Sequence, residues 1–233
     1  MHKISKVVDN NGNIYYEQSN NTYTKKWDAS NDEYIYLFKR DNNIIATGRW
    51  DENDCFAING TAPDGIYSEY YDSGVLQSTL SVSSNTLNGT CKFYYETGIL
   101  KLEGIFVGGK ETGTSKLYNS IGTLEGTSEY KDGKKNGITK LFYKSGTIKA
   151  ILQYNDGNID GIQKTFYESG QKQAVVRFDK GIRNGPTEEF YENGKTMMKG
   201  NFINDNLDGQ VVQYYESGRV KSSKTFDNGK LIK

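Results

Sequence analysis

The chain has 233 residues with 29 basic and 29 acidic side chains, and this balance argues against binding to nucleic acids or other polyanions through bulk charge. Only 35% of the residues are hydrophobic, yet 13% are aromatic, among them 18 Tyr and 10 Phe. Disordered chains are poor in aromatic residues and unbalanced in charge, so the composition favours a thin β structure that buries rings. Cys55 and Cys91 are too few for a disulfide framework and are expected to be ordinary thiols.

The first 64 residues are the irregular part of the sequence. Phe38, Ile44, Gly48 and Trp50 follow a spacing of aromatic, aliphatic, small and aromatic residues that recurs later in the chain. We expect residues 1–64 to form degenerate hairpins that cap one edge of the fold, because an open β array needs protection at its edges. The N-terminus lacks the apolar stretch of a signal peptide and no run is long enough to span a bilayer, so a cytoplasmic protein is expected.

Residues 65–233 repeat with a period of 24 residues. One glycine series opens the copies: Gly65, Gly89, Gly113, Gly137, Gly161, Gly185 and Gly209. A second series follows nine residues later: Gly74, Gly98, Gly122, Gly146, Gly170, Gly194 and Gly218. An aromatic residue recurs between the two glycines: Tyr70, Tyr94, Tyr118, Phe142, Phe166, Phe190 and Tyr214. The next residue is Tyr in every copy except the third, which has Asn119.

These turn residues predict one β-hairpin per repeat. Gly beside Ser, Asn or Asp tolerates the positive φ that tight hairpin turns require. If the turns close tightly, the second aromatic of a copy, such as Tyr167, is expected opposite the first aliphatic of the returning strand. A single hairpin is marginally stable, so consecutive copies must pair or stack. The predicted fold is all-β, an elongated array of tandem 24-residue antiparallel β-hairpin repeats, with seven copies forming one continuous domain over residues 65–233.

Two local motifs resemble ligand-binding loops. Residues 104–110 have the glycine and lysine spacing of a phosphate-binding loop, but Glu111 stands where a Ser or Thr should hold magnesium, and no strand-to-helix pattern surrounds it. Residues 156–161 resemble the first half of a calcium loop, but Tyr167 occupies the position of the bidentate Glu. We interpret both as turns of the repeat, and leave open only a weakly bound surface cation at the second.

Catalytic groups are scarce. His2 is the only histidine and lies at the terminus, which removes His-based triads and most zinc sites. The carboxylates recur with the repeat, and a thin array offers no deep pocket that would raise a pKa. The sequence therefore predicts no enzyme, with no catalytic residues, no metal site and no cofactor.

The repeat is clearest in Tyr94-Tyr95-Glu96-Thr97-Gly98-Ile99-Leu100-Lys101 and Phe142-Tyr143-Lys144-Ser145-Gly146-Thr147-Ile148-Lys149. This pattern resembles the bacterial variant of the MORN repeat, well over residues 65–233 and weakly over the first 64. The resemblance implies a relation to antitoxin or immunity proteins of the YwqK family. MORN proteins elsewhere are scaffolds and membrane-associated adaptors.

One repeat position suggests a binding surface. The residue after the second tyrosine is acidic in five copies, with Ser120 and Lys144 breaking the series: Asp72, Glu96, Glu168, Glu192 and Glu216. If the hairpins lie in register, these side chains form an acidic edge beside the rings of Tyr95, Tyr167, Tyr191 and Tyr215. Such an edge suits a basic protein, for example a nuclease toxin, through charge steering around aromatic anchors. The alternative is that charged turns simply keep the array soluble and monomeric.

We therefore expect a non-catalytic, monomeric protein-binding repeat protein. The resemblance favours an antitoxin or immunity protein that neutralises a cognate toxin by direct binding. The alternative is a structural or membrane-peripheral adaptor, which is less favoured because the neutral charge and the lack of a Lys/Arg cluster do not suit an anionic membrane surface. No nucleic-acid partner is expected.

Overall fold

The structure is a computed structural model that describes residues 4–8, 14–18, 23–28, 33–40, 43–50, 56–62, 64–71 and 73–232. All regular secondary structure in these ranges is β-strand, and the paired strands are antiparallel. None of these residues belongs to a helix long and apolar enough to cross a membrane. The prediction of an all-β fold built from tandem antiparallel hairpins is confirmed.

The chain forms two compact units, which are described separately. Unit 1 comprises residues 1–122 and 131–133, and unit 2 comprises residues 123–130 and 134–233. The boundary expected after residue 64 stays a prediction.

Unit 1 begins with two small sheets. The first pairs β1 (Ile4–Val8) with β2 (Ile14–Gln18). The second has four antiparallel strands in chain order: β3 (Tyr23–Asp28), β4 (Glu33–Arg40), β5 (Asn43–Trp50) and β6 (Phe56–Gly60). These strands precede the regular repeats in the sequence, and the capping role expected of residues 1–64 stays a prediction.

The repeats of unit 1 supply six further strands. They are β7 (Gly65–Tyr70), β8 (Leu76–Ser83), β9 (Thr86–Leu87), β10 (Gly89–Tyr94), β11 (Leu100–Val107) and β12 (Lys110–Tyr118). The core of the unit lies where the four-stranded sheet meets the first repeats, and the rings of Phe38 and Tyr67 meet there edge to face with centroids 5.1 Å apart. Leu80, Leu87 and Cys91 are buried in the same cluster.

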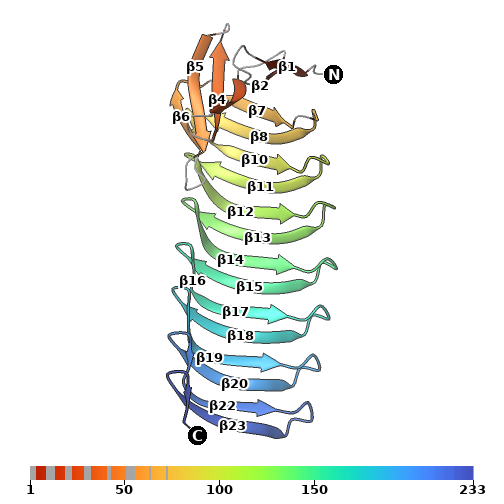
Figure 1. The fold of residues 1–233 in the computed structure, drawn as a ribbon, viewed down its shortest axis with the longest axis vertical. Helices are drawn as coiled ribbons and strands as arrows, with labels where there is room; N and C mark the ends of the chain where they lie inside the picture. The colour runs from red at the N-terminus through yellow and green to blue at the C-terminus, as the bar shows by residue number, and fades with distance from the viewer. Residues whose placement is uncertain are drawn as a thin grey trace. The chain divides into compact units, whose positions relative to one another are not determined.

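Unit 2 contains the remaining twelve strands. They are β13 (Leu124–Lys131), β14 (Lys134–Phe142), β15 (Ile148–Asn155), β16 (Asn158–Ile159), β17 (Gly161–Phe166), β18 (Lys172–Asp179), β19 (Ile182–Phe190), β20 (Thr196–Ile203), β21 (Asn206–Leu207), β22 (Gly209–Tyr214), β23 (Val220–Asp227) and β24 (Lys230–Leu231). From β14 onward each long strand pairs with the next, so consecutive hairpins of this unit lie side by side (Figure 1).

Two kinds of turn alternate along the repeats. The two-residue turns, such as Asp156-Gly157 and Asn204-Asp205, have positive φ at both central residues, +48° and +86° in the first and +48° and +65° in the second. This is the type I′ geometry that matches the twist of a hairpin and favours Asn, Asp and Gly. The expectation that the calcium-like motif at Asp156 is a hairpin turn is confirmed. Gly108-Gly109, inside the phosphate-loop-like motif, joins β11 to β12 in the same way.

The other turns begin at the second aromatic position of each repeat, and we call them tyrosine turns. In the turn of Tyr167, the Gly170 N–H donates to the Tyr167 carbonyl at 2.9 Å and the Tyr167 N–H donates to the Gln171 carbonyl at 2.8 Å. Only the glycine has positive φ, +87°. In unit 2 the tyrosine turns lie along the right side of Figure 1 and the two-residue turns along the left.

The pairing across each tyrosine turn differs from the sequence-based expectation by one residue. The register shifts between Thr165 and Phe166: Thr165 lies opposite Ala174 and Phe166 lies opposite Lys172, so the returning strand contains one extra residue at a β-bulge. In the copies with an aliphatic residue the same holds, as in Tyr94 opposite Leu100 and Phe142 opposite Ile148. The prediction that Tyr167 lies opposite the first aliphatic position of the returning strand is therefore wrong, because the bulge shifts the register by one residue and Phe166 takes that place.

The repeat strands of unit 2 bury one face, and mostly small side chains line it. Along β14 and β15 of unit 2, Thr139, Ala150 and Leu152 are buried while their neighbours Lys140, Lys149 and Ile151 are more exposed. Thr187 and Val211 continue the buried position of Thr139 at the repeat period of 24 residues. This alternation is the two-residue period of a half-buried strand.

Candidate functional site

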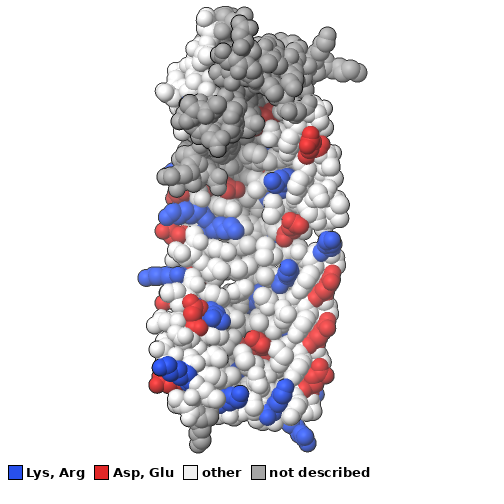
Figure 2. Space-filling model, in the orientation of Figure 1, with Lys and Arg blue, Asp and Glu red and all other residues white. Residues whose placement is uncertain are grey.

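The acidic positions predicted from sequence lie at the tips of the tyrosine turns. Glu168, Glu192 and Glu216 belong to consecutive turns of unit 2 and are exposed, and acidic side chains gather along the lower right edge of the surface in Figure 2. Because each repeat of unit 2 contributes two long strands, neighbouring turns are spaced by about two strand separations, roughly 10 Å. That spacing is close to the Debye length at physiological salt, about 8 Å, so the three carboxylates act as one weakly coupled row.

The other predicted acidic residues are placed differently. Glu96 is exposed at the tip of its own turn in unit 1. Asp72 lies outside the described residues. The structure therefore brings together three of the five predicted carboxylates, and we call Glu168, Glu192 and Glu216 the acidic row.

The tyrosines beside these carboxylates have a structural contact that the sequence pattern did not reveal. The Tyr167 hydroxyl donates a hydrogen bond to the carbonyl of Phe190 at 2.8 Å, and the Tyr191 hydroxyl does the same to Tyr214 at 2.8 Å. The donor and acceptor are 23 residues apart, so each bond joins one repeat to the next. Equivalent bonds are made by Tyr71, Tyr95 and Tyr143 to Tyr94, Tyr118 and Phe166 at 2.6, 2.9 and 2.7 Å.

These contacts determine how much of each ring faces solvent. Tyr95, Tyr167 and Tyr191 are half-buried, whereas Tyr215 is 48% exposed. Burial, with the carboxylates of Glu96 and Glu69, raises the pKa of the Tyr71 hydroxyl, which keeps it protonated as a donor. The tyrosines thus hold consecutive repeats together, and Tyr215 is the predicted site residue that presents most of its ring for contact.

Asn119 is the exception among the tyrosine positions. Its side-chain oxygen accepts a hydrogen bond from the Ile121 N–H within the same turn at 3.1 Å. This local bond is typical of Asn in turns. The side chain of Ile121, at the tip of that turn, is 71% exposed.

At three of the tyrosine turns a lysine lies close to the tyrosine ring. Lys101, Lys149 and Lys221 each place the ammonium group 5.7 to 5.8 Å from the ring centroid of the tyrosine in their own repeat. The repeats of Glu168 and Glu192 have Gln173 and Met197 at the same position. At these two consecutive turns no cation among the described residues lies over the tyrosine ring, although Lys172 and Lys195 are nearby in the sequence.

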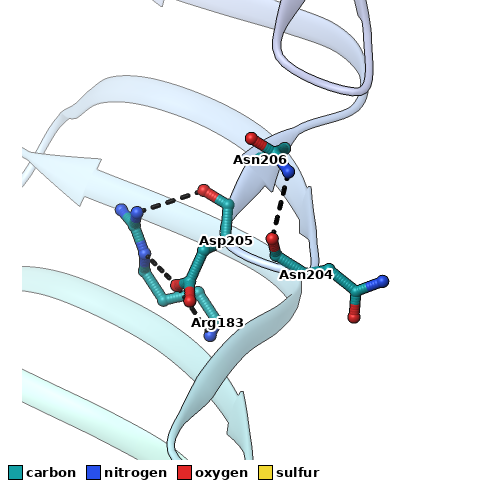
Figure 3. A network of polar contacts seen from close by, with 4 residues as sticks. All are labelled: Arg183, Asn204, Asp205 and Asn206. Atoms are coloured by element: carbon teal, nitrogen blue, oxygen red, sulfur yellow. Dashed lines mark hydrogen bonds and ion pairs between the residues drawn. The ribbon is translucent and has the colours of Figure 1, made fainter.

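The opposite side of unit 2 contains a polar network around the turn Asn204-Asp205 (Figure 3). The backbone N–H and Nε of Arg183 donate to Oδ1 of Asp205 at 3.0 and 2.9 Å, and its Nη2 donates to the Asp205 carbonyl at 3.1 Å. The hydrogen bonds from Arg183 lower the pKa of the Asp205 carboxyl. The guanidinium also lies 4.1 Å from the centroid of the Phe202 ring.

This network connects a turn to the preceding repeat, as backbone bonds do at the other two-residue turns. The Asp205 N–H donates to the Arg183 carbonyl at 3.0 Å, and the Gly157 N–H donates to the Lys135 carbonyl at 2.9 Å. One feature of the sequence indicates that this turn is unusual: Asn204-Asp205 lacks the glycine that most of the two-residue turns contain. Its contacts are internal to the fold and give no sign of a reaction centre.

No arrangement of catalytic groups was found in the described part of the chain. A shallow, open hollow in unit 2 is lined by Asp160, Arg177, Phe178, Asp179, Asn184, Gly185 and Pro186, which include two carboxylates but no Ser, Thr, Cys, Lys or His. Within the same ranges, no group of three or more His, Cys, Asp or Glu side chains is placed to hold a metal ion. Cys91 is fully buried and burial raises the pKa of its thiol, which makes it a poor nucleophile.

Comparison with known proteins identifies the repeat. A family model described as the MORN repeat variant matches residues 63–82, 87–107, 135–156, 159–180, 183–204 and 207–232. The segments leave out residues 108–134, which include Asn119. A comparison with curated proteins found none that matches. A solved structure described as "Crystal Structure of TcdB2-TccC3-Cdc42" is similar at 14% sequence identity and a TM-score of 0.23, over 97% of this chain and 12% of that one.

Proposed function

The chain belongs to the MORN repeat variant family, whose repeats typically bind proteins or membranes, and from this premise we propose that it is an antitoxin or immunity protein that neutralises a basic protein toxin. It acts without catalysis, as a monomer in the cytoplasm, by covering a functional surface of its partner. One observation carries the proposal: three consecutive tyrosine turns of unit 2 each present an exposed carboxylate at the same position.

The support for this role is geometric. Each carboxylate of the acidic row is at the tip of a turn closed by two backbone hydrogen bonds, as the Tyr191 turn is closed by Tyr191 N–H to Lys195 O at 2.8 Å and Gly194 N–H to Tyr191 O at 2.9 Å. The hydroxyl of Tyr191 anchors the turn to the next repeat. Turns held in this way lose little conformational freedom when a partner binds, and preorganised binding surfaces gain affinity for that reason.

Charge decides which partner suits this surface. A row of carboxylates attracts a basic protein and accelerates the encounter, and this effect weakens with salt. The exposed ring of Tyr215 at the last of these turns provides one amphipathic anchor of the kind enriched at interfaces. A toxin that acts on nucleic acid carries the basic surface that this row would cover.

The test is co-expression of the chain with the product of the neighbouring gene, with growth and co-purification measured. We expect growth to be restored and a 1:1 complex to be recovered. The triple substitution Glu168→Gln, Glu192→Gln and Glu216→Gln should weaken that complex at least about tenfold, chiefly through slower association. The matched control removes three exposed carboxylates elsewhere, through Glu125→Gln, Asp179→Asn and Asp227→Asn, and should retain rescue.

Two outcomes would remove the proposal. Blocked growth with no recovered complex excludes the immunity role for that neighbour. Binding of the chain to vesicles or to itself, without rescue, would instead identify a membrane-peripheral adaptor or scaffold. If the triple variant and its control behave alike, the acidic row is not the contact surface.

A further inference from the structure

The outward face of β14, β15, β17 and β18 in unit 2 carries cations without carboxylates between them. Alternation along these strands places Lys140, Lys149, Lys164 and Arg177 on the face opposite Thr139, Ala150 and Leu152, which are buried. All four cationic side chains are exposed. The first carboxylate at an outward position of these four strands is Asp179, at the end of β18.

Two of these cations alternate with aliphatic side chains in a single row across the strands. Lys140 is opposite Ile151, Ile151 is opposite Lys164, and Lys164 is opposite Val175. Ile151 and Val175 are half-buried, so part of each remains accessible between the cations. We call these four residues the cation-aliphatic row.

The cations of this row lack the acidic neighbours that the same positions have in other repeats. In unit 1, Lys92 and Lys116 occupy the repeat position of Lys140 and Lys164, and both pair with Glu103 at 3.3 and 3.5 Å. The position of Glu103 is taken by Ile151 and Val175 in unit 2.

The following repeat restores an ion pair, with Lys199 Nζ 3.0 Å from Glu188 Oε1. Across the ranges that the structure describes, Lys140, Lys164 and Arg177 have no carboxylate within ion-pair distance. At this repeat position, Lys140 and Lys164 are thus left without a carboxylate where Ile151 and Val175 replace the acidic partner.

We propose that the cation-aliphatic row binds an acidic amphipathic helix of a protein partner. Neighbouring strands are about 4.8 Å apart. Residues three or four apart on a helix advance by about 5 Å along its axis. A helix lying across the strands, with acidic and aliphatic residues alternating at that spacing, presents carboxylates to Lys140 and Lys164 and aliphatic groups to Ile151 and Val175.

The aliphatic members of the row favour a protein over other anionic ligands. A nucleic-acid backbone offers phosphates but no aliphatic groups, and single strands are held by stacking on aromatic rings, which this row does not contain. The exposed Ile162, 45% accessible on the neighbouring part of the same face, extends the apolar contribution. The proposal uses none of the residues of the acidic row, so it stands or falls independently of the proposed function.

The experiment uses the full chain and a labelled helical peptide of about three heptads, with Glu at each a position, Leu at each d position, and Ala and Gln elsewhere. Affinity is measured by fluorescence anisotropy at about 0.05 M and about 0.3 M salt. We expect saturable binding that weakens with salt. A peptide with Gln for every Glu, and another with Ser for every Leu, should each bind more weakly.

The variant Lys140→Gln with Lys164→Gln should lower the affinity at least about fivefold, and Lys140→Arg with Lys164→Arg should preserve it. The matched control, Lys224→Gln with Lys230→Gln, removes the same charge from exposed positions on β23 and β24 and should stay within about twofold of the unmodified chain. Absence of binding, equal loss in both double variants, or equal binding of the Leu-to-Ser peptide would overturn the proposal. The proposal would also be overturned if the chain did not bind the peptide but bound anionic vesicles in a way that depends on Lys140. That result would identify a membrane surface as the partner instead.

Discussion

At the residue scale, the tyrosine that follows the first strand connects consecutive hairpins in five of the repeats, a role that the sequence pattern does not reveal. Its ring is half-buried, and its hydroxyl donates to a backbone carbonyl 23 residues further along. That carbonyl belongs to the aromatic residue at the end of the first strand of the following hairpin, next to the β-bulge of that hairpin. A side-chain bond thus satisfies a backbone acceptor at a place where the regular ladder is interrupted.

Replacing Tyr191 by Phe tests this role. The substitution removes the hydroxyl that bonds Tyr214 and leaves the ring in place. We expect the free energy of unfolding to fall by about 1 kcal/mol, the usual net value of one hydrogen bond, in urea denaturation. Tyr215→Phe is the control, because no hydrogen bond of the Tyr215 hydroxyl was found among the described residues, and it should change little. A Tyr191 variant as stable as its control would show that the bond does not contribute.

At the scale of the elements, the two kinds of turn make different demands on the backbone. The two-residue turns require positive φ at both central positions, and even Lys180 adopts +48° there. The tyrosine turns require it at the glycine alone, as at Gly146 with φ +85°. Since L-residues with a Cβ pay for this conformation, the second glycine series marks the places where the first strand of each hairpin must reverse.

The substitution Gly146→Val isolates that backbone requirement. A Cβ at this position would meet no atom within 4 Å, so the cost arises from φ and not from a clash. We expect a loss of about 2 kcal/mol or more in unfolding free energy, because β-branched residues are strongly disfavoured at positive φ. Thr147→Val, one residue later, should cost much less, and Gly146→Asn should recover part of the loss. Equal melting shifts for the two Val variants would contradict the turn assignment.

At the scale of the whole molecule, burial is unevenly distributed between the units. The main hydrophobic cluster is in unit 1, where residues of the N-terminal four-stranded sheet pack on the first repeats. The buried residues of unit 2 are mostly small, such as Thr139, Ala150 and Thr187, with Phe202 as the largest. Repeats of this kind depend on contacts with their immediate neighbours, so each added hairpin contributes a similar small increment.

Phe38 should therefore be one of the most sensitive positions in the chain. Its side chain is 2% exposed and its ring meets Tyr67 edge to face. We expect Phe38→Ala to lower the stability of unit 1 by about 3 to 5 kcal/mol, as measured by hydrogen exchange of the β7 and β8 amides. Ile66→Ala on the same unit is the control, because Ile66 is 75% exposed and should cost less than about 0.5 kcal/mol. Similar protection in both variants would show that the N-terminal sheet does not stabilise the first repeats.

Several features of the candidate site could be read directly from the repeat register. The exposure of Glu168, Glu192 and Glu216 follows from their place between a strand-ending aromatic and a turn glycine. The hydroxyl bond of Tyr167 could not be read in this way, because its acceptor is a backbone carbonyl, which any residue at position 190 would supply. The lack of a carboxylate beside Lys140 and Lys164 could not be predicted from the sequence either, because it depends on Ile151 lying opposite both of them.

The sequence by itself determined the alternation of strands and turns, because glycine at positive φ and the two-residue alternation of side chains are local requirements of the backbone. It determined the positions of the exposed turn residues for the same reason. Only the tertiary structure decided which aromatic lies opposite the start of the returning strand, since a β-bulge with one extra residue on that strand shifts the register by one. It also decided which charges are paired, because ion pairs such as Lys116 with Glu103 and Arg183 with Asp205 join side chains on different strands or turns that come together only when the hairpins lie in register.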